Sequence, residues 1–187
     1  MSLNGVRFAP CNCLTNDEDE DVLFMFVTGN EDNEYTSASK YAVILDTDAA
    51  EEKNGDDTVY TYDVVIDGEE TTLSFKKDNA PKFELEKGLV FAYAMDGDYA
   101  TVKDVTAPTT AQAKTATKDY FTDANDTQYN LSDAKALYTI NVEYKKDGTT
   151  IDSVYVTTGV DIDAGDKVVY TLDGDDLDVL FVYDDIK

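Results

Sequence analysis

Carboxylate side chains gather at the tight turns of this chain. Residues 96–98 read DGD, residues 173–176 read DGDD, and residues 161–166 contain three aspartates. Calcium takes roughly six to eight oxygen ligands, which acidic loops can supply. The candidate calcium ligands are therefore Asp96, Asp98, Asp161, Asp163, Asp173 and Asp175. A local explanation stands beside this one, because Asp-Gly pairs form turns and the aspartate carboxylate caps neighbouring N–H groups.

Tyrosines inside the apolar runs offer a second kind of site. Tyr93 and Tyr170 hold matching places in two similar segments, GLVFAYAMDGD (88–98) and GDKVVYTLDGD (165–175). An aromatic side chain exposed on a β face can stack on a sugar or a protein partner, so both are candidate binding-face residues. The alternative is that they pack on the pleated faces, since aromatic residues favour strands.

Catalytic constellations are not visible in the sequence. The chain has no histidine, so a nucleophilic triad would lack its usual base. No pair of carboxylates stands out as a glycosidase acid and nucleophile, and no glycine-rich phosphate loop occurs. Cys11 and Cys13 are too close together for an ordinary disulfide and lack a second pair for zinc, so their role stays open. The sequence predicts a protein that is not an enzyme.

The charge of the chain restricts its partners. Fifteen basic residues (Lys+Arg 15) face forty acidic ones (Asp+Glu 40), which gives a formal net charge of -25. Such a surface repels nucleic acid and anionic membranes, and no apolar run is long enough to span a bilayer. We expect neither nucleic-acid binding nor membrane insertion.

Four pairs of alternating runs indicate β-hairpins around Asp-Gly. An Asp-Gly pair between β-formers is a strong hairpin signal, because a type I′ turn needs positive φ at both central residues. No long helical periodicity competes with it. The predicted hairpins join residues 58–66 to 71–75, 89–95 to 99–105, 137–144 to 150–156, and 166–172 to 177–183.

These hairpins repeat along the chain. Gly88 and Gly165 each precede the glycine of the next Asp-Gly pair by the same interval, and the earlier hairpins align through Gly68 and Gly148. Residues 21–24 (DVLF) are identical to residues 178–181, which suggests that the chain opens with the closing strand of a preceding copy. The sequence predicts tandem units with a period of about 77–80 residues.

The predicted fold class is all-β, with two tandem small antiparallel β-barrel or sandwich modules. The expected boundaries are an atypical acidic leader (1–20), a first β module (21–106), an extended linker (107–118) and a second β module (119–187). The linker assignment rests on the composition of APTTAQAKTATK, which contains only Ala, Pro, Thr, Gln and Lys.

The strand and turn pattern over residues 21–185 resembles the repetitive β regions of bacterial surface-layer proteins, the Firmicutes type that carries S-layer homology domains. The segments that carry the resemblance are YDVVIDGEETTLSF, LEKGLVFAYAMDGDYATVKDV and IDAGDKVVYTLDGDDLDVLFVY. The resemblance implies an extracellular, non-enzymatic role at the bacterial cell surface or cell wall, often with calcium. It transfers no functional residue, because no S-layer homology anchor is visible.

The expected function is therefore a structural segment, a spacer or lattice element, that associates with itself or with other cell-wall and surface components. The first residues do not form a signal peptide, so we expect the chain to be part of a longer exported protein. The alternative is an adhesin-like β module that binds carbohydrate or protein through a tyrosine-bearing face.

Overall fold

The computed structural model describes residues 12–15, 22–26, 40–55, 57–103 and 105–186. Contacts divide the chain into two units, Met1–Ser37 and Ala38–Lys187, and each is described by itself. In the first unit, β1 (Asn12–Thr15) and β2 (Val22–Phe26) form an antiparallel two-stranded sheet. The opening strand expected near residue 21 thus has a partner within the chain. Of the expected acidic leader, residues 1–11, which include Cys11, and residues 16–20 lie outside the described residues. Residue 21, where the first module was expected to begin, also lies outside them.

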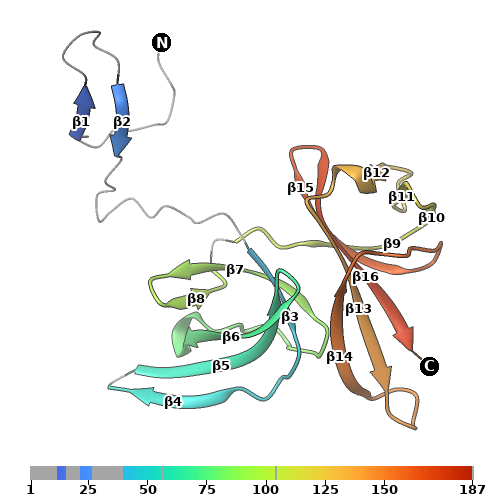
Figure 1. The fold of residues 1–187 in the computed structure, drawn as a ribbon. Helices are drawn as coiled ribbons and strands as arrows, with labels where there is room; N and C mark the ends of the chain where they lie inside the picture. Colours follow the sequence, from blue (N-terminus) through green and yellow to red (C-terminus); the bar gives the residue numbers. More distant parts are fainter. Residues whose placement is uncertain (1–11, 16–21, 27–39, 56, 104, 187) are drawn as a thin grey trace. The chain divides into compact units, whose positions relative to one another are not determined.

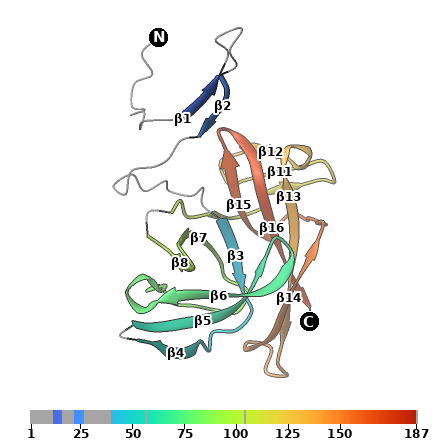
Figure 2. The ribbon, with the colours of Figure 1, turned by 60° about the vertical axis from the view of Figure 1, so that its left-hand side comes forward.

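The second unit consists almost entirely of strands, as Figures 1 and 2 show. Two short 3-10 turns, η1 (Lys77–Asn79) and η2 (Leu131–Asp133), are its only helical elements among the described residues. Several sheets pack in a sandwich-like arrangement, which confirms the all-β prediction. Within the part of the chain that the structure describes, no helix has the length and apolar character needed to cross a bilayer.

The first half of this unit (residues 40–103) contains a closed ring of strands. Its sheet has the order β3-β7-β8-β6-β5-β4, and β3 also pairs with β5. Five strands therefore close on themselves, while β4 adds to the outer edge of β5. The strands are β3 (Lys40–Ile44), β4 (Ala50–Asn54), β5 (Asp57–Ile66), β6 (Glu69–Lys76), β7 (Val90–Asp96) and β8 (Tyr99–Thr101).

The second half (residues 105–186) combines a five-stranded sheet with a small three-stranded one. The larger sheet has the order β14-β13-β16-β15-β9, and its central pair, β13 and β16, is parallel. Its strands are β9 (Thr109–Gln112), β13 (Ala136–Tyr144), β14 (Ile151–Thr158), β15 (Lys167–Asp173) and β16 (Asp176–Ile186). The smaller sheet holds β10 (Thr115–Ala116), β11 (Tyr120–Thr122) and β12 (Gln128–Asn130).

Three apolar clusters hold the second unit together. The barrel core lies inside the ring and includes Ile44, Val64 and Phe75. The sheet core lies between the two sheets of the second half and includes Phe121, Leu180 and Val182. The shared core joins the two halves through Val43, Val65, Val90, Tyr138, Ile140, Val142, Val154, Val169 and Phe181.

Alternation along the strands produces these three cores. In β16, Leu180 and Val182 point into the sheet core, while Phe181 between them points into the shared core. In β3, Ile44 faces the barrel core and Val43 faces the shared core. Successive side chains of a strand point to opposite faces, so a strand covered on both faces needs apolar residues at every position. The continuous runs VVI (64–66) and VLFV (179–182) follow from this double burial.

All four Asp-Gly pairs lie at hairpin turns, but only one matches the type I′ geometry that we expected. Asp67 and Gly68 have φ values of 53° and 84°. At the other three turns the glycine alone is left-handed, with φ of 61° at Gly97, 71° at Gly148 and 68° at Gly174. At the third turn the Gly148 N–H donates to the Lys145 carbonyl over 2.8 Å, so a type I turn precedes the left-handed glycine there.

The segment 107–118, which we expected to be a linker, contributes strands to both sheets of the second half. β9 pairs with β15, and β10 pairs with β11. The backbone is extended, as expected, but its N–H and C=O groups pair within the sheets. Small Thr and Ala side chains fit this position, since the pairing depends on the backbone and asks little of the side chains.

Candidate functional site

The six candidate calcium ligands lie at three separate turns. Asp96 ends β7 and Asp98 follows in the turn, and both are exposed. Asp161 and Asp163 lie in the loop between β14 and β15, where the Asp163 N–H donates to Asp166 Oδ2 over 2.8 Å. Asp173 accepts a hydrogen bond from the Lys135 ammonium over 3.0 Å, and Asp175 is exposed in the next turn.

These aspartates do not assemble a calcium site. Among the described residues, no three acidic or other ligating side chains are grouped so as to hold a metal ion. Calcium needs several oxygen ligands at once, so pairs of carboxylates on separate turns do not fit it. The residues present therefore do not match the calcium that the surface-layer resemblance implies.

The local explanation of the acidic turns is visible at Asp147. Its Oδ1 accepts hydrogen bonds from the N–H groups of Thr149 and Thr150, each over 2.9 Å. Its Oδ2 accepts from the Thr150 hydroxyl over 2.6 Å. These bonds favour the charged carboxylate and lower the pKa of Asp147 to about 2. At this turn the aspartate organises the backbone.

Tyr93 and Tyr170 do not form a binding face, and that prediction is wrong for both residues. Each side chain is only 3% exposed. Tyr93 packs in the barrel core and Tyr170 in the sheet core, because β7 and β15 are interior strands covered on both faces. The Tyr170 hydroxyl donates to the Tyr129 hydroxyl over 3.2 Å, and burial raises the pKa of Tyr170 strongly. The alternative explanation, packing by strand-forming residues, describes both positions.

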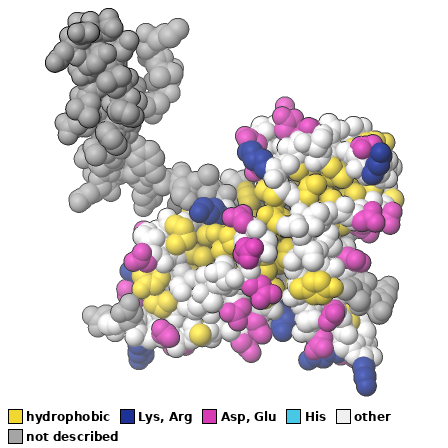
Figure 3. Space-filling model, in the orientation of Figure 1, with side chains coloured by type: hydrophobic (Ala, Val, Ile, Leu, Met, Phe, Trp, Pro, Cys, Tyr) yellow, Lys and Arg dark blue, Asp and Glu magenta, His cyan; other side chains and the backbone are white. Residues whose placement is uncertain are grey.

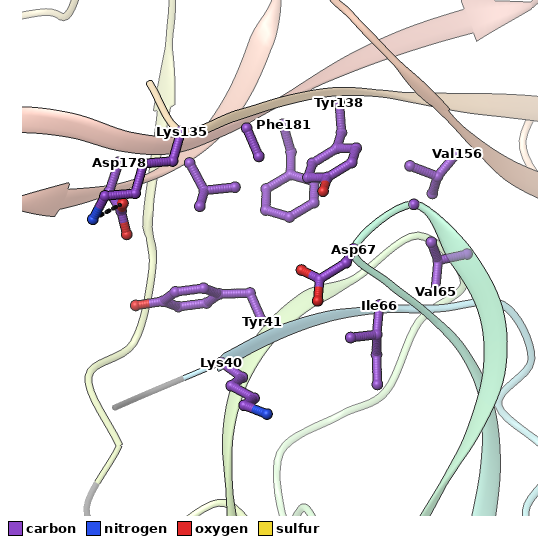
Figure 4. A pocket seen from close by; sticks show the side chains of 13 residues that line it. Lys40, Tyr41, Val65, Ile66, Asp67, Lys135, Tyr138, Val156, Asp178 and Phe181 are labelled. Atoms are coloured by element: carbon purple, nitrogen blue, oxygen red, sulfur yellow. Dashed lines mark ion pairs between the residues drawn. The ribbon is translucent and has the colours of Figure 1, made fainter. Parts of the chain in front are cut away.

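A cavity of about 500 Å³ lies between the two halves of the second unit, and we call it the inter-half cavity. Figure 4 shows the ring of Tyr41 on one side and the rings of Tyr138 and Phe181 on the other. The Asp67 carboxylate points into the space between them, and Asp178 lies at the far end beside Lys135. These aromatic walls are built from residues that sequence reasoning did not select.

Each wall of the inter-half cavity has a simple structural cause. Tyr41 precedes Ala42 on β3, so its side chain points away from the barrel core and toward the second half. Tyr138 and Phe181 are partners across the parallel pair of β13 and β16, and their rings stack with centroids 5.3 Å apart. Glycine suits position 68 at this wall, because φ is positive there and a Cβ would lie 3.3 Å from the Tyr138 side chain, which would have to shift.

The electrostatics of the inter-half cavity are negative near the rings. Burial raises the pKa of Tyr41, and the charge of Asp178 raises it further. Burial also raises the pKa of Tyr138, and the charge of Asp67 raises it further. A raised tyrosine pKa is the expected response to a nearby carboxylate, since the phenolate would be repelled.

The two carboxylates differ in their partners. The Lys135 ammonium lies 3.0 Å from Asp178 Oδ1 as an ion pair, but Oδ1 is buried and has no directed hydrogen bond. Lys135 also forms an ion pair with Asp173, with Lys135 Nζ 3.0 Å from Asp173 Oδ2. None of the ion pairs among the described residues includes Asp67. Asp67 is exposed to solvent and belongs to none of these ion pairs, so no lysine in them compensates its charge at the aromatic walls.

A second, more polar cavity of about 670 Å³ also lies between the halves. Asp161 and Asp163 line it together with Asp166, Asp184 and Glu86. The Tyr183 hydroxyl donates to the Gly88 carbonyl over 2.8 Å, and the Lys167 ammonium lies 4.0 Å from the centre of the Tyr183 ring. The bond between Tyr183 and Gly88 joins the two halves, whereas Lys167 and Tyr183 both belong to the second half.

Local spacing could not reveal the inter-half cavity. Its aromatic residues come from β3, β13 and β16, which are far apart in the sequence and meet only through sheet pairing and the shared core. The one local signal was the Asp67-Gly68 turn, which we recognised only as a hairpin.

Comparison with known proteins adds no relative. No protein-family description, curated protein or solved structure matches this chain.

Proposed function

We propose that the chain is a non-enzymatic structural segment of a bacterial cell-surface or S-layer-type protein, a stiff spacer or lattice element. The observation that carries the proposal is the shared core. Its nine buried side chains come from both halves of the second unit, so this unit is a single body rather than two domains joined by a flexible linker. A spacer needs this property, because a flexible joint between repeats would not transmit length.

The surface of the molecule supports the same role. Acidic side chains lie over the visible face of the second unit in Figure 3, and the formal net charge is -25. Like charges keep neighbouring copies apart and soluble, which suits a crowded surface layer. The surface-layer assignment itself depends on the resemblance of the strand and turn pattern.

Two measurements test the proposal. Antibodies raised against residues 38–187 should label intact cells of the native host, and brief protease treatment of those cells should remove the signal. A cytoplasmic marker that is labelled only after permeabilisation is the control. Labelling that requires permeabilisation would place the protein inside the cell and contradict a surface role.

Stiffness is measured separately by the distance between the halves. Spin labels at Asp98→Cys and Asp175→Cys, in a Cys11→Ser and Cys13→Ser background, mark one exposed turn in each half. We expect a single narrow distance distribution, because the shared core fixes the two halves. A broad distribution would remove the basis of the spacer proposal.

The alternative function, an adhesin-like module that binds carbohydrate or protein, has lost the residues on which it rested, since Tyr93 and Tyr170 are buried. Any binding role must use other side chains.

A further inference from the structure

The inter-half cavity combines aromatic walls with one uncompensated carboxylate. Tyr41 faces the stacked pair of Tyr138 and Phe181, and the Asp67 carboxylate points between them (Figure 4). The face of an aromatic ring attracts a cation, and the attraction grows when the cation is partly removed from water. A carboxylate beside the rings adds direct charge attraction. These are the elements of an organic-cation site.

We propose that the inter-half cavity binds an alkylammonium group, with its carbon-bound hydrogens against the rings of Tyr41, Tyr138 and Phe181 and its charge beside the Asp67 carboxylate. The site is independent of the spacer role and goes beyond it.

The chemistry of the walls favours this ligand over the other classes. A hard metal ion needs several oxygen ligands, which rings cannot supply. An anion would meet Asp67, Asp178 and the negative field of the whole chain. Lys135 does not reverse the local sign, because it is paired with Asp178 and Asp173. Lys40 is exposed at the rim, and its ammonium points away from the space between the rings.

The size of the cavity also fits an organic cation. A volume of about 500 Å³ exceeds what a bare ammonium ion fills and admits a trimethylammonium head or the end of a lysine side chain. Two sources share this chemistry, a small free quaternary amine and a lysine side chain of a partner protein. The experiment distinguishes them.

The test is a titration of the uniformly 15N-labelled full chain at low salt, followed by NMR. Choline chloride and Nα-acetyl-lysine methylamide are the two cationic probes, and 3,3-dimethylbutan-1-ol is the uncharged isostere of choline. We expect the Asp67 and Gly68 amides to shift saturably with at least one cation and not with the alcohol. Tighter binding of choline would identify a small quaternary amine as the ligand, and tighter binding of the lysine derivative a protein side chain.

Variants locate the binding. Asp67→Asn removes the charge, and asparagine tolerates the left-handed backbone of this turn, so we expect a correctly folded chain with about tenfold weaker binding. Tyr41→Leu removes one ring and should also weaken binding. Asp98→Asn is the matched control, an equal charge change at an exposed turn that does not line the cavity, and its affinity should equal that of the wild type.

Three results would overturn the proposal. They are the absence of saturable shifts with both cations, equal shifts with the uncharged alcohol, and wild-type affinity in Asp67→Asn. Equal binding of the alcohol would assign the cavity to neutral ligands instead.

Discussion

Because the two halves share a core, we expect a destabilising substitution in the second half to lower the stability of the first half as well. Leu180 is fully buried on β16 and packs in the sheet core, which is made only of second-half residues. Leu180→Ala removes three carbons, worth about 2.4 kcal/mol by transfer alone. The void that remains adds to this, so we expect the free energy of unfolding to fall by about 3–4 kcal/mol.

Native-state hydrogen exchange measures how far this loss spreads. If Ala38–Lys187 unfolds as one cooperative unit, the slowest amides of β5 in the first half should exchange more than about 100-fold faster, and those of β16 should accelerate equally. Leu172→Ala is the matched control, because the same substitution is made on β15 at a side chain that is 42% exposed. That control should change the free energy of unfolding by less than about 0.5 kcal/mol.

The reasoning would be refuted if Leu180→Ala accelerated exchange in β13–β16 alone. The first half would then be stable without its neighbour, and the shared core would be a contact between two independent bodies.

Three further outcomes are expected. Stability should fall as pH rises from about 10 to 12, because burial raises the pKa of Tyr183 to about 12 while the unfolded chain releases this proton at the ordinary tyrosine pKa of about 10. In urea denaturation at a series of pH values, Tyr183→Phe should make this alkaline loss of stability smaller. At pH 7 it should lower the free energy of unfolding by about 1 kcal/mol, because the bond to the Gly88 carbonyl is lost. An unchanged alkaline slope would show that other groups cause the loss. The NMR shifts of the Thr149 and Thr150 amides should titrate with a midpoint near 2. The charged Asp147 carboxylate stabilises this turn fully above its unfolded pKa of 3.8, and the stabilisation is lost as pH falls through about 2. A midpoint near 4 would contradict the hydrogen bonds at this turn. Addition of EDTA should leave the melting temperature of the calcium-equilibrated chain unchanged, because no described acidic cluster can hold the ion, and a clear drop would restore the acidic turns as metal sites.

The hairpins were predictable because their signals are local. The strands around Asp67-Gly68 and Asp173-Gly174 begin and end close to the expected ranges, and the largest difference is at the end of β16, which continues to Ile186. The agreement is good because period-2 patterns and turn residues act over a few positions. β4 and β9 were missed for the opposite reason. Their sequences, AEEKN and TTAQ, carry no apolar alternation, and they are strands because a neighbouring edge offers them backbone hydrogen bonds.

The candidate sites were harder to predict. Tyr93 was a candidate for a binding face with core packing as the alternative, because an apolar run with a tyrosine does not reveal which of its faces is covered. The partners of Asp67 in the inter-half cavity depend on which outer face of the barrel meets which sheet, and this is a non-local property. The Asp-Gly pairs located the hairpins in the sequence but not the contact between the two halves of the second unit.

The position of β16 has a consequence for synthesis of the chain. This strand lies between β13 and β15 at the centre of its sheet, yet among the described strands of the second unit it leaves the ribosome after the others. The first half leaves the ribosome earlier, when Val43, Val65 and Val90 still lack the second-half side chains that cover them in the folded unit. At roughly 5–20 residues per second this apolar face stays uncovered for several seconds during translation.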